Sequence, residues 1–251
     1  MNKLNKTLHK WVSLIVGIQL LIWLGTGLYF NLVDGRAASG NENRVRVQHE
    51  GNIADFQLFP INRLQVEGVQ EMDLVWLMQK PYYALTLSKG AHSYQKSERV
   101  LFDAVYGQRH LVSEEEILDV AKSSYKGQGE LISVTKLMPP IVELPKQENP
   151  VWQVTFDDEQ ATNVYLSADT GRVLAHINDS RRLRDLMFKL HFMDYGNVGS
   201  FNNWFSVLFA FLSLSLSVTG AVWVVQMLKR GSYRIGRRRK GAKVRLGRQG
   251  A

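Results

Sequence analysis

Two long stretches without a formal charge constrain this chain more than any other feature. The first runs from Trp11 to Phe30 and the second from Trp204 to Leu228. At ~1.5 Å of rise per residue, a helix of about 20 residues matches the ~30 Å hydrocarbon core of a bilayer. We therefore expect two transmembrane helices, at residues 11–30 and 204–228.

The first stretch also has features of a cleaved signal peptide, because lysines precede it and small residues follow at Ala37–Ser39. The apolar part of a signal peptide usually has about 7–15 residues, and this stretch is longer. It carries Trp11, Trp23 and Tyr29 near its ends, as is typical of side chains that anchor a span at the membrane interface. We interpret it as a retained anchor.

Charge separates the two tails from the segment between the spans. Of 31 Lys and Arg, 3 precede the first span and 10 follow the second, whereas all 23 Asp and Glu lie between them. Positive flanks stay on the cytoplasmic side. We therefore expect a bacterial inner-membrane protein with both termini cytoplasmic and residues 31–203 mainly periplasmic.

The same distribution decides the role of the basic tail after Leu228. Because it starts where a span ends, its simplest role is to fix topology and to attract anionic lipid headgroups. We expect contact with membrane lipids and no nucleic-acid binding. The chain has no cysteine, which excludes disulfides, zinc-thiolate sites and iron–sulfur clusters.

The segment between the spans contains two similar parts, each with alternating strands and a glycine turn. Aligning Gly107 with Gly171 also aligns Ala104 with Ala168. In the second part, Ser113 precedes Glu116 by three residues, the spacing of a helix capping box. We expect each part to be a helix followed by three antiparallel strands.

These patterns predict an α+β protein in which two transmembrane helices flank an extracytoplasmic domain of two helix-plus-antiparallel-sheet repeats. In the first repeat we expect a shorter helix near Ile61–Val69. The predicted parts are a cytoplasmic N-terminus (1–10), the first span (11–30), a linker (31–43), the repeats (44–112 and 113–179), an amphipathic surface helix (180–195), the second span (204–228) and a basic cytoplasmic tail (229–251).

Two histidines lie beside the predicted membrane segments. His9 precedes the first span and shares a helical face with Ser13 and Gly17. His191 lies at the edge of the apolar face of the helix over 180–195, which we expect on the outer membrane surface. Small residues near His9 leave room for a ligand, or they let a second helix approach closely.

Several motifs in this order resemble the PepSY-associated membrane proteins. They are LHKW at residues 8–11 with the Thr26-Gly27 step, SEEEILDVA from Ser113, YLSADTGRVL in the second repeat, LMFKLHFMDYGN around His191, and VTGAVWVV in the second span. Larger members resemble ferric–siderophore reductases and iron-regulated proteins that hold b-type haem between histidines on about four spans. The resemblance implies b-haem, with His9 and His191 as ligands of its iron. His176 is a reserve ligand.

This chain has two predicted spans, and the two histidines are expected at opposite membrane faces. A haem iron with two axial ligands would then need a homodimer or a second membrane subunit. We find no G-x-G-x-x-G, G-x-S-x-G or H-E-x-x-H motif. Whether the chain is an enzyme, such as a ferric reductase, stays open. The alternative is a non-enzymatic anchored protein, because PepSY-like units elsewhere resemble modules that bind peptidases or other partner proteins.

Overall fold

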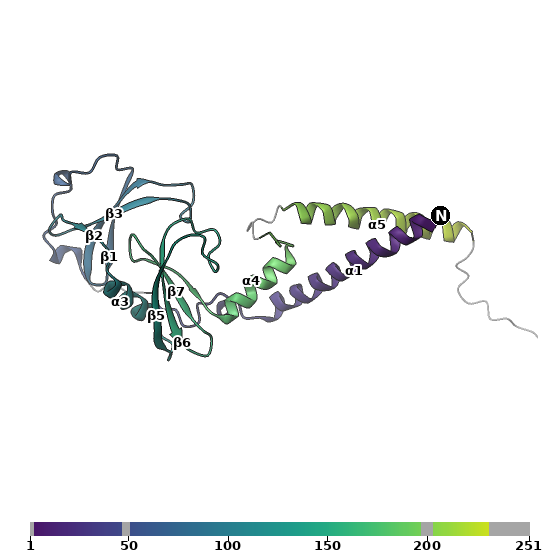
Figure 1. The fold of residues 1–251 in the computed structure, drawn as a ribbon, viewed down its shortest axis with the longest axis horizontal. Coiled ribbons are helices and arrows are strands. Elements are labelled where there is room, and N and C mark those ends of the chain that lie inside the picture. The colour runs from purple at the N-terminus through teal and green to yellow at the C-terminus, as the bar shows by residue number, and fades with distance from the viewer. Residues whose placement is uncertain (1–2, 47–50, 197–202, 231–251) are drawn as a thin grey trace, which may run out of the picture. The chain divides into compact units, whose positions relative to one another are not determined.

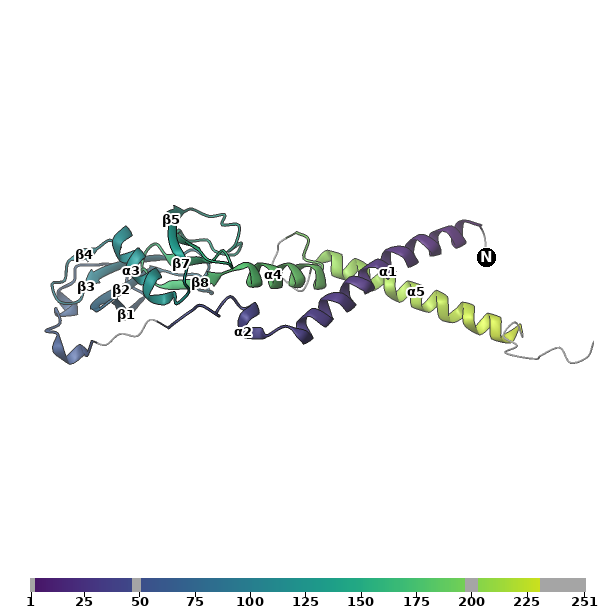
Figure 2. The same ribbon diagram turned by 90° about the horizontal axis from the view of Figure 1, so that it is seen from below.

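The computed structural model describes residues 3–46, 51–196 and 203–230 (Figures 1 and 2). The chain divides into two compact units: the part of the first helix up to Leu20 together with the region from Trp204, and residues Leu21–Asn203. The larger unit contains two antiparallel sheets, which confirms the prediction of a mixed helix and sheet domain between two apolar helices.

The smaller unit pairs the first part of α1 (Lys3–Leu32) with α5 (Trp204–Lys229). The stretches long and apolar enough to cross a membrane are His9–Leu32 and Trp204–Lys229, so both predicted apolar helices are confirmed. The ring of His9, near the start of α1, lies 6.3 Å from the ring of Trp223, near the end of α5. Within this unit the two helices are therefore antiparallel, as Figure 1 also shows.

Each sheet in the larger unit has four strands in sequence order. The first sheet contains β1 (Glu71–Leu77), β2 (Lys80–Ser88), β3 (Glu98–Asp103) and β4 (Arg109–His110). The second contains β5 (Glu130–Leu137), β6 (Val151–Asp157), β7 (Asn163–Ser167) and β8 (Val173–Ile177). The other elements are α2 (Gly35–Ala38), α3 (Glu114–Ser124), α4 (Asp179–His191) and two short 3-10 helices, Ile53–Asp55 and Ile61–Arg63.

The helix α3 joins the two sheets into one core. Its start has the predicted capping box, in which Ser113 Oγ accepts from the Glu116 amide and the Glu116 carboxylate accepts from the Ser113 amide at 2.8 Å. The helix buries one face. That face lies in a single apolar cluster with both sheets, which includes Leu77, Tyr82, Ala84, Leu101, Ile117, Val120, Ala121, Val154, Phe156, Val164 and Leu166.

The two glycines aligned in the sequence occupy equivalent turns. Gly107 has φ +69° and Gly171 has φ +67°, a conformation that favours residues without a Cβ. The amide of Gly107 donates to Asp103 O and that of Gly171 to Ser167 O, both at 2.9 Å. The turns therefore match in backbone conformation and in hydrogen bonding.

Two details of the predicted units are wrong. The helix near Ile61–Val69 is only the 3-10 helix Ile61–Arg63. Leu64 and Val66, two residues apart, pack beside Tyr83 and Leu85 of the first sheet, and that spacing suits an extended chain rather than a helix. Each sheet also has four strands rather than three, and β1 was not among the predicted strands.

Candidate functional site

His191 is the last residue of α4, a helix capped by Asn178, whose side chain accepts from the Arg181 amide at 3.0 Å. Its Nδ1 lies 2.8 Å from the Oγ1 of Thr26 in α1. Thr26 is buried, with 4 % of its surface exposed, and His191 is half-buried. The predicted ligand therefore points at a side chain of the first apolar helix.

The contact with Thr26 fits the tautomer of His191 that carries its proton on Nδ1. Thr26 Oγ1 also lies 2.7 Å from the carbonyl oxygen of Ile22, and a hydroxyl has only one proton to donate. With that proton given to Ile22 O, the hydroxyl accepts from the Nδ1–H of His191. In this tautomer the Nε2 of His191 carries a lone pair, and no group among the described residues hydrogen-bonds to it.

Aromatic rings surround the His191 imidazole. The ring centres of Trp23 and Phe30 in α1 lie 6.3 and 5.6 Å away, and that of Phe192 lies 5.1 Å away. We call Trp23, Thr26, Phe30, His191 and Phe192 the His191 site. The rings that surround the imidazole are apolar. Among the described residues, Thr26 is the only one that hydrogen-bonds to the His191 imidazole.

His9 lies in a separate place. It belongs to the smaller unit, whereas Thr26 and His191 belong to the larger one. The Ser13 hydroxyl donates to the backbone oxygen of His9 at 2.7 Å, and the imidazole meets Trp223 edge to face at 86°. Each predicted ligand thus stands as a single imidazole, and within residues 3–46, 51–196 and 203–230 no group of three or more His, Asp or Glu could hold a metal ion.

His176, the reserve ligand, lies in β8 with 0 % of its surface exposed. Its Nε2 is 3.1 Å from Ser124 Oγ, which itself donates to Ala121 O at 2.8 Å. Burial, with the positive charges of Arg44 and Arg181 nearby, lowers the pKa of His176 to about 4. It is therefore a neutral histidine of the domain interior at physiological pH.

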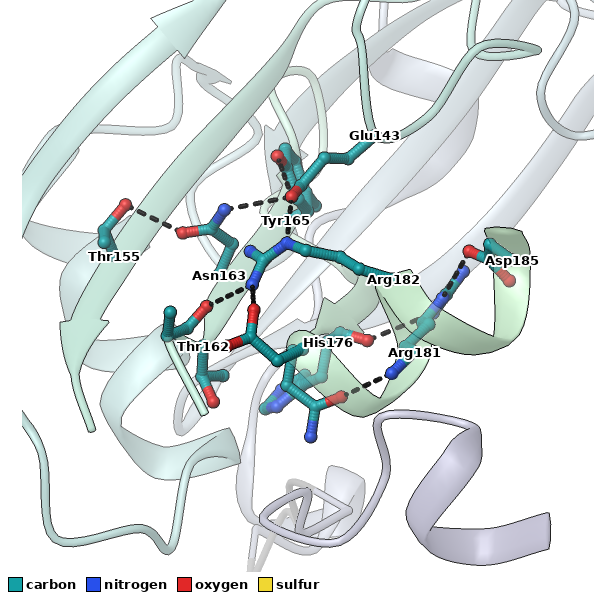
Figure 3. Close-up of polar contacts among 12 residues, drawn as sticks. Glu143, Thr155, Thr162, Asn163, Tyr165, His176, Arg181, Arg182 and Asp185 are labelled. Carbon is teal, nitrogen blue, oxygen red and sulfur yellow. Dashed lines mark hydrogen bonds and ion pairs between the residues drawn. The ribbon is translucent and has the colours of Figure 1, made fainter. Parts of the chain in front are cut away.

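A polar network fixes the start of α4 to the second sheet (Figure 3). The Nε of Arg182 donates to Glu143 Oε1 at 2.6 Å, and the other carboxylate oxygen accepts from Asn163 at 2.9 Å and Tyr165 at 2.7 Å. A further guanidinium nitrogen donates to Asp179 at 2.7 Å. Because His191 ends the same helix, this network positions the His191 site relative to the sheet.

The network also sets the charge of Glu143. Burial by itself raises the pKa of this carboxyl, but hydrogen bonds from Arg182, Asn163 and Tyr165 outweigh burial and leave the pKa below its usual value. Burial and the Glu143 carboxylate raise the pKa of Tyr165. Glu143 is therefore ionised and Tyr165 protonated at neutral pH.

Two residues of this arrangement could not be predicted from the sequence. In the sequence Thr26 stands out only as part of the Thr26-Gly27 step, and nothing there links it to His191. Glu143 lies in an irregular segment, 39 residues before Arg182, and no periodicity marks such a contact. Both are long-range contacts, which local patterns do not encode.

A groove of about 880 Å³ runs along α4 and the irregular segment before β6. Phe188 and Phe192 line it on the α4 side, and the same two rings stack 5.9 Å apart beside His191. Val142, on the opposite side, is 95 % exposed. The groove thus combines exposed apolar side chains with the ion pairs of Arg181 and Arg182.

Comparison with known proteins gives one match. The family model described as PepSY-associated TM region matches residues 6–248, nearly the whole chain. No curated protein and no solved structure matches significantly.

Proposed function

The chain belongs to the PepSY-associated transmembrane family, and from this membership we propose that it is a bacterial inner-membrane protein that binds b-haem. The haem would serve electron transfer across the bilayer or the reduction of ferric iron. The chain is a membrane protein with a mixed helix and sheet domain between two apolar helices.

The observation that carries the proposal is the contact between His191 and Thr26. Imidazole nitrogen is a common axial ligand of haem iron, and ligating histidines donate their other N–H to a fixed acceptor that orients the ring. Thr26 can act as such an acceptor for the Nδ1 of His191, and Nε2 is then left for iron. The rings of Trp23, Phe30 and Phe192 suit a flat apolar macrocycle.

When bound, haem would supply one-electron chemistry at iron. The residues of this chain would orient the imidazole, through Thr26, and exclude water, through the aromatic rings. His9, with Trp223 beside it, is the proposed ligand of a second haem.

Among the described residues each site offers one imidazole, so a second axial histidine would come from another chain. A two-fold homodimer would place His191 opposite its own symmetry mate and His9 opposite its own, because a two-fold interface brings equivalent residues together. A different membrane subunit is the other source. Both arrangements support a protein that works as an oligomer.

An absorbance spectrum tests the proposal. We expect a Soret band from the protein purified in detergent from a haem-replete host, and a smaller band per chain in His9→Ala and in His191→Ala. His92→Ala, a change in an exposed loop, is the matched control and should retain the full band. Purified protein without a Soret band would refute haem binding, and a full band in the double variant would refute the ligand assignment.

We also infer that the two sheets are copies of one PepSY-like unit. The matched turns at Gly107 and Gly171 support this inference, since both the positive φ and the hydrogen bond recur. The first copy lacks a counterpart of α3 among the described residues, because its equivalent segment is extended after Arg63.

A second candidate function is favoured by the groove along α4. Its exposed apolar side chains, with Val142 almost fully exposed, are typical of a protein-binding surface. In this alternative the protein is a non-enzymatic anchor whose domain binds a partner protein or a peptidase. Co-purification of a stoichiometric partner, lost in Val142→Asp and without any chromophore, would support it over the haem proposal.

A further inference from the structure

The larger unit has a second cavity, of about 640 Å³, most of whose lining residues differ from those of the groove along α4. It lies where β1, the start of β3, α3, the turn before β8 and the segment after Asn43 meet. Side chains of the apolar cluster, Leu77, Ala84 and Val120, form its floor. Leu74 and Trp76 line its side. Apolar side chains thus form one part of the cavity lining.

Four arginines line the same cavity, from three places in the chain. Arg44 and Arg46 come from the segment before residue 47, Arg99 from β3, and Arg172 from the turn before β8. Among the described residues, none of the four forms an ion pair or donates a side-chain hydrogen bond. Within the described parts of the chain, Asp73 is the only acid that lines the cavity.

This positive charge is not a consequence of composition. The segment between the spans has more acids than bases, with 23 Asp and Glu against 18 Lys and Arg. In the groove along α4, the arginines are neutralised by Glu143, Asp179 and Asp185. Asp73 lines the second cavity, and Asp169 lies close enough to interact electrostatically with Arg99. Four arginines against these two acids leave an excess of positive charge.

Unpaired guanidinium groups over an apolar floor indicate the chemistry of a ligand. A guanidinium presents a planar fork of N–H donors that matches a carboxylate with two parallel hydrogen bonds. The floor would bury an apolar body, and cavities of about 300–1,000 Å³ suit small organic ligands. Thr86, 2 % exposed, lines the cavity as well and offers a hydroxyl.

We propose that this cavity binds a small organic carboxylate with an apolar body. The arginines bind the carboxylate at the mouth, and Leu77, Ala84 and Val120 contact the apolar part. The site lies in the domain and uses neither His9 nor His191. It therefore does not depend on haem binding.

Calorimetric titration of the full chain in lipid nanodiscs tests the proposal, with empty nanodiscs subtracted. The probes are 2-naphthoate, the uncharged 2-naphthamide with the same rings, and inorganic phosphate, which has charge without an apolar body. We expect 2-naphthoate to bind at least tenfold more tightly than either of the other two probes. Equal binding of 2-naphthamide or of phosphate would overturn the proposal.

Variants of the arginines identify the site. Arg99→Gln with Arg172→Gln should weaken 2-naphthoate binding at least tenfold, whereas Arg99→Lys, which keeps the charge and loses the fork, should weaken it less. Arg109→Gln, in β4 and outside the cavity lining, is the matched control and should bind as the parent does. The thermal midpoint of each variant verifies folding. Unchanged affinity in a folded double variant would overturn the assignment.

Discussion

At the scale of single residues, the hydrogen bond between Thr26 and His191 gives the sharpest test of the ligand assignment. Thr26→Val keeps the shape of the side chain and removes the acceptor for Nδ1. Loss of such a supporting partner typically lowers metal affinity ~10–100-fold. We expect the variant to retain at least tenfold less haem per chain, measured by extraction and haemochrome absorbance.

A matched control exists in the other apolar helix. Thr219 also precedes a glycine, and its hydroxyl bonds to the carbonyl oxygens of Ser215 and Leu216, as that of Thr26 does to Ile22 and Trp23. Thr219→Val therefore removes a similar backbone contact without touching His191. Equal haem loss in both variants would show that haem binding depends on the bond between a threonine hydroxyl and its own helix backbone. It would refute a role for the contact between Thr26 and His191.

The buried His176 predicts how the stability of the domain changes with pH. Its pKa is lowered to about 4 from an ordinary value of 6.5, so between these pH values the unfolded chain binds the proton and the folded chain does not. Stability is therefore lost as the pH falls from 6.5 towards 4. The loss from this group is at most about 3 kcal/mol.

Chemical unfolding at several pH values measures this effect. His176→Gln should show a shallower decrease in unfolding free energy between pH 6.5 and 4 than the parent. His92→Gln, at an exposed position, should follow the parent. An unchanged slope in His176→Gln would show that other groups cause the acid sensitivity.

At the scale of elements, the attachment of α4 depends on Glu143. Glu143→Gln keeps an acceptor oxygen but removes the charge that pairs with Arg182. Because the pair is mostly buried, at 22 % and 31 % exposure of the side chains, we expect a loss of ~1–3 kcal/mol in unfolding free energy. Urea unfolding followed by circular dichroism measures it.

The sign of the pH effect distinguishes this pair from simple packing. The folded pKa of Glu143 is lowered, so its contribution is present above the ordinary carboxyl pKa and is lost as the pH falls through the folded value. The difference between parent and Glu143→Gln should therefore shrink below pH 4.5. Glu159→Gln, exposed in the β6–β7 turn, should behave as the parent at every pH.

Elements with strong local signals could be predicted from the sequence. The capping box at Ser113 specified the start of α3, and uncharged length specified α1 and α5. The helix predicted after Pro60 was wrong, because Leu64 and Val66 pack on the first sheet as extended chain. The candidate site was harder: histidines were visible in the sequence, but Thr26 and Glu143 meet their partners only through the tertiary fold.

At the scale of the whole molecule, charge asymmetry predicts the orientation in the membrane. The tails carry 13 Lys and Arg and no acid, whereas the segment between the spans has an excess of acids. Positively charged segments that flank a membrane span usually stay in the cytoplasm. We therefore predict that the domain is periplasmic and that the end of α5 is cytoplasmic.

The absence of cysteine makes this orientation directly testable, because each introduced thiol is the only one in the chain. Ala91→Cys lies in an exposed loop of the domain, and Arg230→Cys lies directly after α5. In intact spheroplasts a membrane-impermeant maleimide should label Ala91→Cys, and it should label Arg230→Cys only after the membrane is opened. Labelling of both in intact spheroplasts would refute two-span topology, and the reverse pattern would place the domain in the cytoplasm. In that second case the groove and the arginine-lined cavity would meet cytoplasmic ligands, so this result decides which compartment to search for them.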